Sequence, residues 1–370
     1  MEFDFTTLNT GGGVHPFVAE HGVTDPNIIT FSVAEMRLNL APGITAAMHD
    51  IVDRGCFGYA PPDKARFDKA LISWMKNRHN WDIDPAWVLP SSGVVSAMGA
   101  AIRALTEPGD GVIIQTPLYP PFTNSIQHNG HRVLENPLKL EDGRYVMDFD
   151  DLREKAKQAR LLMLCSPHNP VGRVWTREEL EELGEICLEN DLYVFSDEIH
   201  FDLDFTGRHL VLTQAVPELR DRAIIATAPS KTFNLAGCAL SSIIVENQAL
   251  RELLAADISL HCGMYVNTFG YAAATGAYET GGPWLDALLV HLQNNRALLE
   301  GRMKRMLPGA VFYPLEGTYL QWVDLRCLEL EQPELMALLE RAQVFVNDGT
   351  GFGTAGEGHI RFNLACPAAC

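Results

Sequence analysis

Residues 161–172 read LLMLCSPHNPVG, and residues 192–200 read LYVFSDEIH. In both stretches an apolar run without polar alternation ends abruptly in polar residues, which is typical of strands buried on both faces. Between them, Thr176 and Glu179 have the spacing of a capping box and predict a helix that runs to Asn190. A buried strand, a helix and a second buried strand in this order predict a parallel unit of an α/β fold.

The same alternation of predicted strands and helices extends along the chain in both directions. A helical run opens at Pro42 and is closed by Gly55. Further strands are expected at 87–90, 111–115 and 223–227, with helices at 94–105 and 119–128. After residue 246 come helical stretches, 284–307 being the clearest, and then short strands at 310–313, 319–325, 344–346 and 359–364. The pattern predicts an α/β domain with a mostly parallel sheet, followed by a smaller α+β domain.

Composition excludes several classes of protein. The chain has 370 residues, 47% of them hydrophobic and 21% charged, which is an ordinary globular balance. Its net charge of −18 argues against broad binding to nucleic-acid phosphates. We expect no membrane span, because no apolar run reaches about 18 residues. The eight cysteines are scattered and the N-terminus resembles no secretory signal, so we expect free thiols and a cytoplasmic location.

Polar residues follow four of the predicted strands. Tyr119, Asn169, Asp197 and Lys231 each come shortly after a buried apolar run. In open α/β sheets, ligands bind beyond the carboxyl ends of the strands, so these side chains should line one shared binding site. Residues 91–94 read SSGV at the start of a predicted helix, which is a ready anion site. A lysine near an anion site, an aspartate for a pyridinium nitrogen and an asparagine for a phenolic oxygen suit pyridoxal phosphate.

Three segments carry a family resemblance. SPHNPVGRVWT (166–176), SDEIHFDL (196–203) and APSKTFNLAG (228–237) resemble signatures of fold-type I pyridoxal-phosphate enzymes, the class I/II aminotransferase superfamily. With CFGYAPPD (56–63) and GTYLQWVDLR (317–326), the chain is most similar to the MalY/PatB branch of cystathionine β-lyases and C–S lyases. The resemblance implies the aspartate aminotransferase fold. It places a large cofactor domain at 43–280, with a small domain at 281–370 that an N-terminal arm at 1–42 helps to build.

The resemblance also implies roles for individual residues. Lys231 would bind the cofactor covalently and move protons, and Tyr119 would stack on the cofactor ring as a second catalytic candidate. Asp197 would hold the proton of the ring nitrogen, and Asn169 would contact the phenolic oxygen. His200 stands where many relatives carry a tyrosine on that oxygen, so it is either a cofactor contact or a core histidine.

Two further sites follow from the resemblance. Arg361 would bind the α-carboxylate of an amino-acid substrate, because its planar fork fits a carboxylate. Tyr59 would reach the phosphate of a neighbouring subunit, which implies a homodimer with shared active sites. The expected phosphate contacts within the subunit are Gly93, Val94, Val95 and Ser230.

The expected activity is a C–S β-lyase. It would convert L-cystathionine or a related cysteine S-conjugate to pyruvate, ammonia and a thiol. Two alternatives remain open: an aminotransferase on the same fold, and a regulator of the MalY type that binds a transcriptional activator. Residue spacing does not separate the lyase from the aminotransferase, because the cofactor's chemistry permits both.

The chain departs from the family pattern at several places. Ala228 replaces a common hydroxyl residue, and Ala239 replaces a common basic residue. Glu35 and Arg37 stand where the branch usually has two aspartates, which puts a cation near the substrate entrance.

Three competing motifs are weaker. GFGTAG (351–356) matches a dinucleotide pattern but leads into a predicted strand, so we interpret it as a flexible loop near Arg361. His200, Asp202 and His261 match the ligand set of an iron triad, but such triads are typical of all-β folds and this chain is predicted to be α/β. Cys366 and Cys370 lack partner ligands for a metal. We therefore expect no metal.

Overall fold

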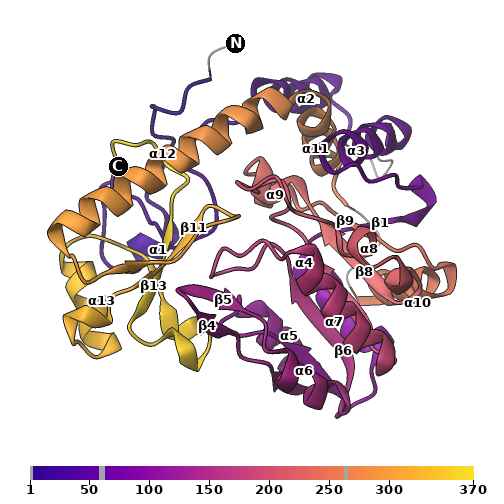
Figure 1. Cartoon of the computed structure of the whole chain (residues 1–370). Helices are drawn as coiled ribbons and strands as arrows, with labels where there is room; N and C mark the ends of the chain where they lie inside the picture. Colours follow the sequence, from indigo (N-terminus) through magenta and orange to yellow (C-terminus); the bar gives the residue numbers. More distant parts are fainter. Residues whose placement is uncertain (1–2, 58–62, 262–265) are drawn as a thin grey trace.

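The computed structural model describes residues 3–57, 63–261 and 266–370. A seven-stranded and a four-stranded sheet form two lobes, and the long helix α12 (Gly282–Met306) runs along one side of the molecule from the lobe of the larger sheet to that of the smaller one (Figure 1). Tyr59 lies outside the described residues. Within the described ranges, no helix combines the length and the apolar character needed to cross a membrane.

The larger sheet has seven strands and confirms the expected mixed, mostly parallel arrangement. Five neighbouring strands are parallel, whereas β9 is antiparallel to both of its neighbours. In spatial order the strands are β1 (Val88–Ser91), β9 (Ser241–Ile244), β8 (Ala223–Thr227), β7 (Tyr193–Asp197), β6 (Ala159–Cys165), β2 (Gly111–Ile114) and β3 (Arg132–Glu135). The polar residues singled out after 111–115, 161–165, 192–196 and 223–227 therefore lie at one edge of the sheet.

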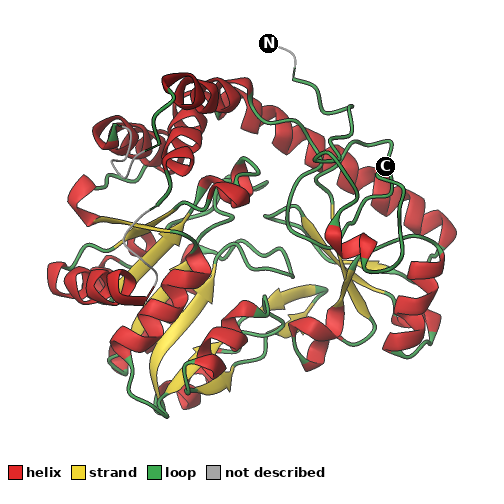
Figure 2. Ribbon diagram, turned by 180° about the vertical axis from the view of Figure 1, so that it is seen from behind, coloured by secondary structure: helices red, strands yellow, loops and turns green. Residues whose placement is uncertain are grey.

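Helices cover both faces of this sheet (Figure 2). The predicted capping box is confirmed at the start of α7 (Arg177–Glu189), where the backbone N–H of Glu179 donates to Thr176 Oγ1 over 3.2 Å. Helix α4 (Val94–Leu105) packs closely on the strands because its buried face is rich in alanine. The other helices of this lobe are α2 (Pro42–Arg54), α3 (Lys64–His79), α5 (Pro121–His128), α6 (Phe149–Ala156), α8 (Leu212–Ala215), α9 (Pro229–Thr232), α10 (Gln248–His261) and α11 (Thr268–Thr280).

The smaller sheet is antiparallel throughout. Its order is β10 (Val311–Phe312), β11 (Leu320–Asp324), β13 (His359–Asn363) and β12 (Asn347–Asp348). Helix α13 (Gln332–Arg341) precedes β12, the short helix α1 (Pro16–Ala19) lies in the N-terminal segment, and β4 (Lys139–Glu141) pairs with β5 (Arg144–Val146) in a separate hairpin.

One expectation for this region needs correction. The strand predicted at 344–346 is wrong: Phe345 makes an isolated bridge to Thr30 of the N-terminal segment, and pairing with β13 begins only at Asn347. The loop expected at 351–356 is built from two short 3-10 turns, and its Phe352 is buried. The strand β13 follows it instead of a helix, so the dinucleotide motif lacks its structural context. The domain boundaries at 42 and 280 stay a prediction.

A buried charge network joins the loop after β6 to the loop before β11. Arg173 is fully buried and its Nε donates to Glu316 Oε2 over 3.0 Å. The same carboxylate accepts from the backbone N–H of Val174 at 3.0 Å and from Arg144 Nη2 at 2.7 Å. Glu316 therefore accepts hydrogen bonds from the buried guanidinium of Arg173 and from the buried backbone N–H of Val174, neither of which has access to water.

Replacing Glu316 by alanine should lower the free energy of unfolding by about 3 kcal/mol, because the buried Arg173 keeps only one of its two carboxylate partners, Glu179, and the backbone N–H of Val174 loses its acceptor. Urea unfolding followed by tryptophan fluorescence measures the loss. Glu185 on α7 is exposed, and its replacement by alanine should change stability by less than about 0.5 kcal/mol. Equal losses in the two variants would show that the network contributes nothing.

Candidate active site

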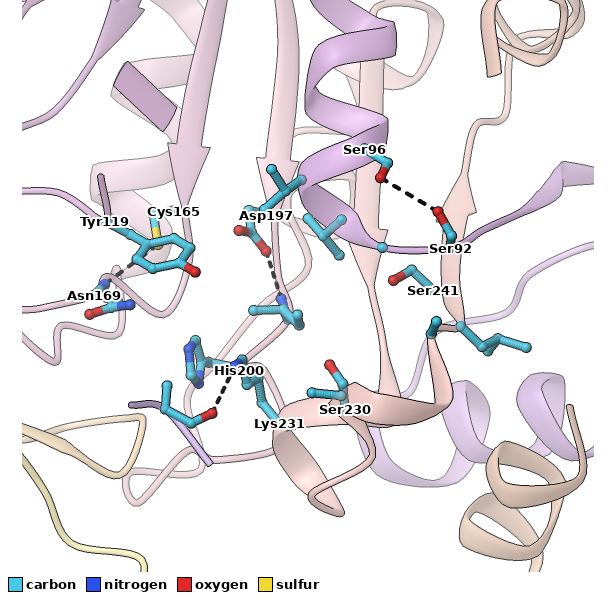
Figure 3. Close-up of a pocket in the computed structure, with 18 residues that line it drawn as sticks. Ser92, Ser96, Tyr119, Cys165, Asn169, Asp197, His200, Ser230, Lys231 and Ser241 are labelled. Atoms are coloured by element: carbon cyan, nitrogen blue, oxygen red, sulfur yellow. Dashed lines mark hydrogen bonds between the residues drawn. The ribbon is translucent and has the colours of Figure 1, made fainter. Parts of the chain in front are cut away.

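One cavity of about 200 Å³ lies at the carboxyl edge of the larger sheet. It collects side chains from the ends of β6, β7 and β8, from the loop before α5 and from the start of α4 (Figure 3). Among the described residues, every predicted cofactor-binding residue lines this cavity, whereas Arg361 is not among its lining residues. The residues brought together are Gly93, Val94, Val95, Tyr119, Asn169, Asp197, His200, Ser230 and Lys231.

Lys231 projects into this cavity from α9, directly after β8. Its Nζ donates a 2.8 Å hydrogen bond to the backbone carbonyl of Ala34. The neighbouring Thr232 donates its hydroxyl to the buried Asp202, which fixes the short helix that carries the lysine. Burial lowers the pKa of Lys231 to about 8, and the charge of Arg361 acts in the same direction. A substantial fraction of the amine is therefore neutral near physiological pH.

Asp197 lies at the end of β7 and is only 5% exposed. Its Oδ1 accepts from the backbone N–H of Ile199 over 3.1 Å. Burial raises the pKa of Asp197 to about 7, and the positive charge of Lys231 opposes the rise. Among the described residues it forms no ion pair within 4.0 Å. A buried carboxylate of this kind is suited to a cationic N–H donor placed in the cavity.

Asn169 and Arg361 are joined by a buried hydrogen bond. Arg361 Nη1 donates to Asn169 Oδ1 over 3.0 Å, which leaves the amide nitrogen of Asn169 for the cavity that this residue lines. Arg361 comes from β13 and is held by the carbonyl of Ser32 at 2.8 Å, with its guanidinium 4.8 Å from the ring of Phe352. Its Nε is buried without a partner in the structure, and burial lowers the pKa of Arg361 to about 10. Arg361 is therefore a buried cation whose Nε–H donor is unused.

Tyr119 and His200 lie on the same side of the cavity as Asn169. The backbone N–H of Tyr119 donates to the carbonyl of Asn169 over 3.1 Å, and burial raises the pKa of its phenol. His200 is 3% exposed, and its Nδ1 is buried without a partner. Burial, together with the charges of Lys231 and Arg361, lowers the pKa of His200 well below its usual value. A neutral imidazole thus faces the cavity, although its role stays a prediction.

The opposite side of the cavity has the groups expected of an anion site. The N-terminus of α4 presents backbone N–H groups from Val94 onward, and Ser92 donates its hydroxyl to that of Ser96 over 3.5 Å (Figure 3). Ser230 and Ser241 add their side chains to the same wall. Sequence reasoning missed Ser96 and Ser241. The signal for Ser96 was available, because it is the third residue of the helix whose start was expected to bind an anion.

The residues of the competing iron motif have other roles in the structure. Both oxygens of Asp202 are engaged, since it accepts from Trp74 Nε1 at 3.0 Å and from Thr232 Oγ1 at 2.8 Å. His261 ends α10, whereas His200 lines the cavity. In the part of the chain that the structure describes, no group of three or more His, Cys, Asp or Glu side chains is arranged to hold a metal ion.

The buried environment of Lys231 gives a direct test. In cofactor-free protein, the rate at which an amine-directed reagent labels Lys231 should have a pH midpoint near 8, against ~10.4 for an unperturbed lysine. Asp197→Asn removes a negative charge that favours the protonated amine, so it should move this midpoint lower. Peptide mass spectrometry resolves the site, with the exposed Lys304 as internal reference. A midpoint that stays near ~10.4 in both proteins contradicts this account of the cavity.

Comparison with known proteins gives consistent matches over nearly the whole chain. The model of the family "Aminotransferase class I and II" matches residues 26–369. Cystathionine beta-lyase PatB of Bacillus subtilis is 39% identical, over 94% of this chain and 90% of PatB. Protein MalY of Escherichia coli is 30% identical, over 92% of this chain and 88% of MalY.

Solved structures agree with these relatives. Cystalysin from Treponema denticola, which contains a pyridoxal 5'-phosphate cofactor, superposes with a TM-score of 0.95 at 36% identity and covers 100% of this chain and 96% of its own. The pyridoxal-phosphate-bound C–S lyase from Staphylococcus hominis has a TM-score of 0.87 at 32% identity, over 93% and 89% of the two chains. The chain belongs to the class I and II aminotransferase family of pyridoxal-phosphate-dependent enzymes, in the branch that contains PatB and MalY.

Proposed function

We propose that this chain is a pyridoxal-phosphate-dependent C–S β-lyase that cleaves L-cystathionine or a related cysteine S-conjugate to pyruvate, ammonia and a thiol. One observation carries the proposal. A buried lysine amine, Lys231, and a buried carboxylate, Asp197, line the same cavity, and the groups of an expected anion site form its opposite side. The choice of a lyase is supported by relatives named cystathionine beta-lyase and by solved C–S lyases.

The residues present fit the cofactor. The N-terminus of α4 and the serine hydroxyls beside it would hold the phosphate, and they supply the polar contacts that Ala228 lacks. Asp197 would accept the N–H of the pyridinium ring, which stabilises the ionised carboxylate in its buried position. Asn169 would donate its amide to the phenolic oxygen, and Tyr119 would cover the ring. When bound, pyridoxal phosphate supplies an electron sink that stabilises the negative charge left at the substrate Cα.

The chain's own residues would then handle the substrate and its protons. Arg361 would bind the α-carboxylate through its unpartnered Nε, which orients the Cα–H bond. Lys231 Nζ has a pKa near 8 and can accept the Cα proton. Breaking the Cα–H and Cβ–S bonds leaves a Cα–Cβ double bond and a thiolate, which the ammonium of Lys231 can protonate. Water then converts the enamine to pyruvate and ammonia.

An aminotransferase is the second candidate. LL-diaminopimelate aminotransferase 2 of Trichormus variabilis is 26% identical over 91% of this chain. Both reactions begin with removal of the Cα proton by Lys231, so the same cavity serves either one. They differ in whether the electron pair expels the sulfur or the proton returns to the cofactor.

Incubation of the holoenzyme with L-cystathionine should release pyruvate and free thiol in equal amounts, measured by coupled reduction of pyruvate and by a thiol reagent. Lys231→Ala should lower kcat by roughly 10³-fold or more, because the proton acceptor is lost. Lys304→Ala, an exposed change on α12, serves as the matched control. Amino transfer to a keto acid without release of thiol would rule out the lyase.

We also propose that the enzyme is a homodimer in which Tyr59 of one subunit reaches the phosphate of the other. Exposed apolar side chains support this: Phe57 is 57% exposed and Leu260 is 78% exposed. A large apolar side chain that is exposed in one subunit can be buried against a second subunit, which removes its apolar surface from water.

Mixing two inactive variants tests the shared site. Lys231→Ala and Tyr59→Ala homodimers, unfolded and refolded together, should recover about a quarter of wild-type activity, because half of the dimers are mixed and each of these has one intact site. Each variant refolded alone is the control. If the mixture is no more active than the sum of the two variants, Tyr59 acts within its own subunit or not at all.

A further inference from the structure

The N-terminal segment meets the reactive lysine at residues 32–37, where it forms neither helix nor strand. Of these residues, all of which the structure describes, Ala34 alone lines the cavity, and its carbonyl accepts a 2.8 Å hydrogen bond from Lys231 Nζ. The carboxylate of Glu35 is paired with Arg37 Nη2 over 2.8 Å, and neither residue lines the cavity. The 32–37 segment therefore contacts the lysine through a backbone carbonyl.

Side chains of β13 hold this segment in place. Arg361 and Asn363 are two residues apart on the strand, so both side chains project from the same face. Arg361 Nη2 donates to the carbonyl of Ser32 over 2.8 Å. Asn363 Nδ2 donates to the carbonyl of Val33 over 2.6 Å and to that of Glu35 over 2.7 Å. The smaller sheet thus fixes three carbonyls of a segment that has no regular structure of its own.

The amide of Asn363 fixes the peptide unit that carries the Ala34 carbonyl. Its two acceptors belong to the residues on either side of Ala34. Because peptide units are planar and each residue has only two soft dihedral angles, a unit between two anchored neighbours has little freedom to turn. Asn363 is 5% exposed, and its Oδ1 accepts from the backbone N–H of Ala365 over 2.8 Å, so its own orientation is fixed as well.

The larger lobe also holds the 32–37 segment. Asn234 follows the reactive lysine by three residues, and its side chain accepts from the backbone N–H of Met36 and donates to the carbonyl of Met36, both over 2.9 Å. The loop that carries the lysine is therefore tied to the segment that carries its acceptor. The direction of the Ala34 carbonyl itself is set by Asn363 and by Tyr319, whose hydroxyl donates to it over 2.9 Å.

We propose that Asn363 is a positioning residue for Lys231, acting through the Ala34 carbonyl. This inference deepens the proposed lyase function and rests on it. An ammonium group has three donors, and binding one of them to a fixed carbonyl sets where the nitrogen lies relative to the substrate Cα. The same nitrogen would accept the Cα proton and then deliver a proton to the departing sulfur. A displacement of about 1 Å can slow such a transfer by roughly 10²-fold.

Turnover of the holoenzyme tests this role. Asn363→Ala should lower kcat for L-cystathionine roughly tenfold or more and leave KM within about twofold, because Arg361 keeps its contacts with Asn169 and Ser32. The deuterium isotope effect on kcat, for substrate deuterated at Cα, should rise because proton removal becomes slower relative to the other steps. A loss of stability alone would not change this isotope effect.

A second measurement needs no turnover. In cofactor-free protein, the pH midpoint for labelling of Lys231 should fall by roughly one unit in Asn363→Ala, because a displaced carbonyl no longer favours the protonated amine. The charged groups that act on the pKa of Lys231, namely Arg361, Asp197 and Glu35, are all kept in this variant.

Asn136→Ala is the matched control. Asn136 is fully buried, and its Nδ2 also donates to two oxygens, the carbonyl of Asp148 at 2.9 Å and Asp151 Oδ2 at 2.8 Å, but it does not line the cavity. Its replacement should lower stability and change neither the isotope effect nor the midpoint. If Asn363→Ala does not fold, Asn363→Ser takes its place, because a serine hydroxyl can still accept from the backbone N–H two residues on.

The outcomes separate this inference from the lyase function. A larger isotope effect and a lower midpoint in the Asn363 variant alone support the positioning role. If that variant keeps both wild-type values, or if Asn136→Ala changes them equally, the positioning role is overturned while the lyase stands. If the wild-type holoenzyme releases no pyruvate from L-cystathionine, the lyase function fails, and the labelling midpoint still decides whether Asn363 positions the amine.

Discussion

The carbonyl oxygen of Ala34 is the contact on which the site depends. It accepts a 2.8 Å hydrogen bond from Lys231 Nζ and a 2.9 Å bond from the hydroxyl of Tyr319. One backbone atom of the N-terminal segment thus joins the lysine after β8 to the tyrosine before β11. Because this acceptor is neutral, it holds the amine in place without forming an ion pair. Burial can then lower the pKa of Lys231 to about 8 and leave a base that works near neutral pH.

The remaining charges are spaced around that amine. Asp197 lies at the end of β7 and the expected anion site lies at the start of α4, so the two ends of a bound cofactor would be held by different elements of the larger lobe. Arg361 comes from the smaller sheet and reaches Asn169, which follows β6. Under the proposed function, a substrate carboxylate bound at Arg361 would be linked through one hydrogen bond to Asn169, the residue that would contact the cofactor. The proposed reaction therefore depends on residues from both sheets keeping their relative positions.

Much of this arrangement could be predicted from the sequence, because parallel strands end at a common edge and their next residues are polar. Lys231, Asp197 and Asn169 were found on that ground. Other parts left no such signal. The contribution of Ala34 is a backbone carbonyl in an irregular segment, and Ser241 lies on β9, which runs antiparallel to its neighbours. The apolar residues 344–346 read as a strand, but their partner proved to be Thr30, far away in sequence.

The most direct test of the account is whether Lys231 binds the cofactor. Purified protein with added pyridoxal phosphate should show an absorbance band in the visible region. Borohydride reduction should abolish the band, and mass spectrometry should then find the reduced cofactor attached to the peptide that contains Lys231. A colourless protein that takes up no pyridoxal phosphate, or a cofactor attached to another lysine, would contradict the account.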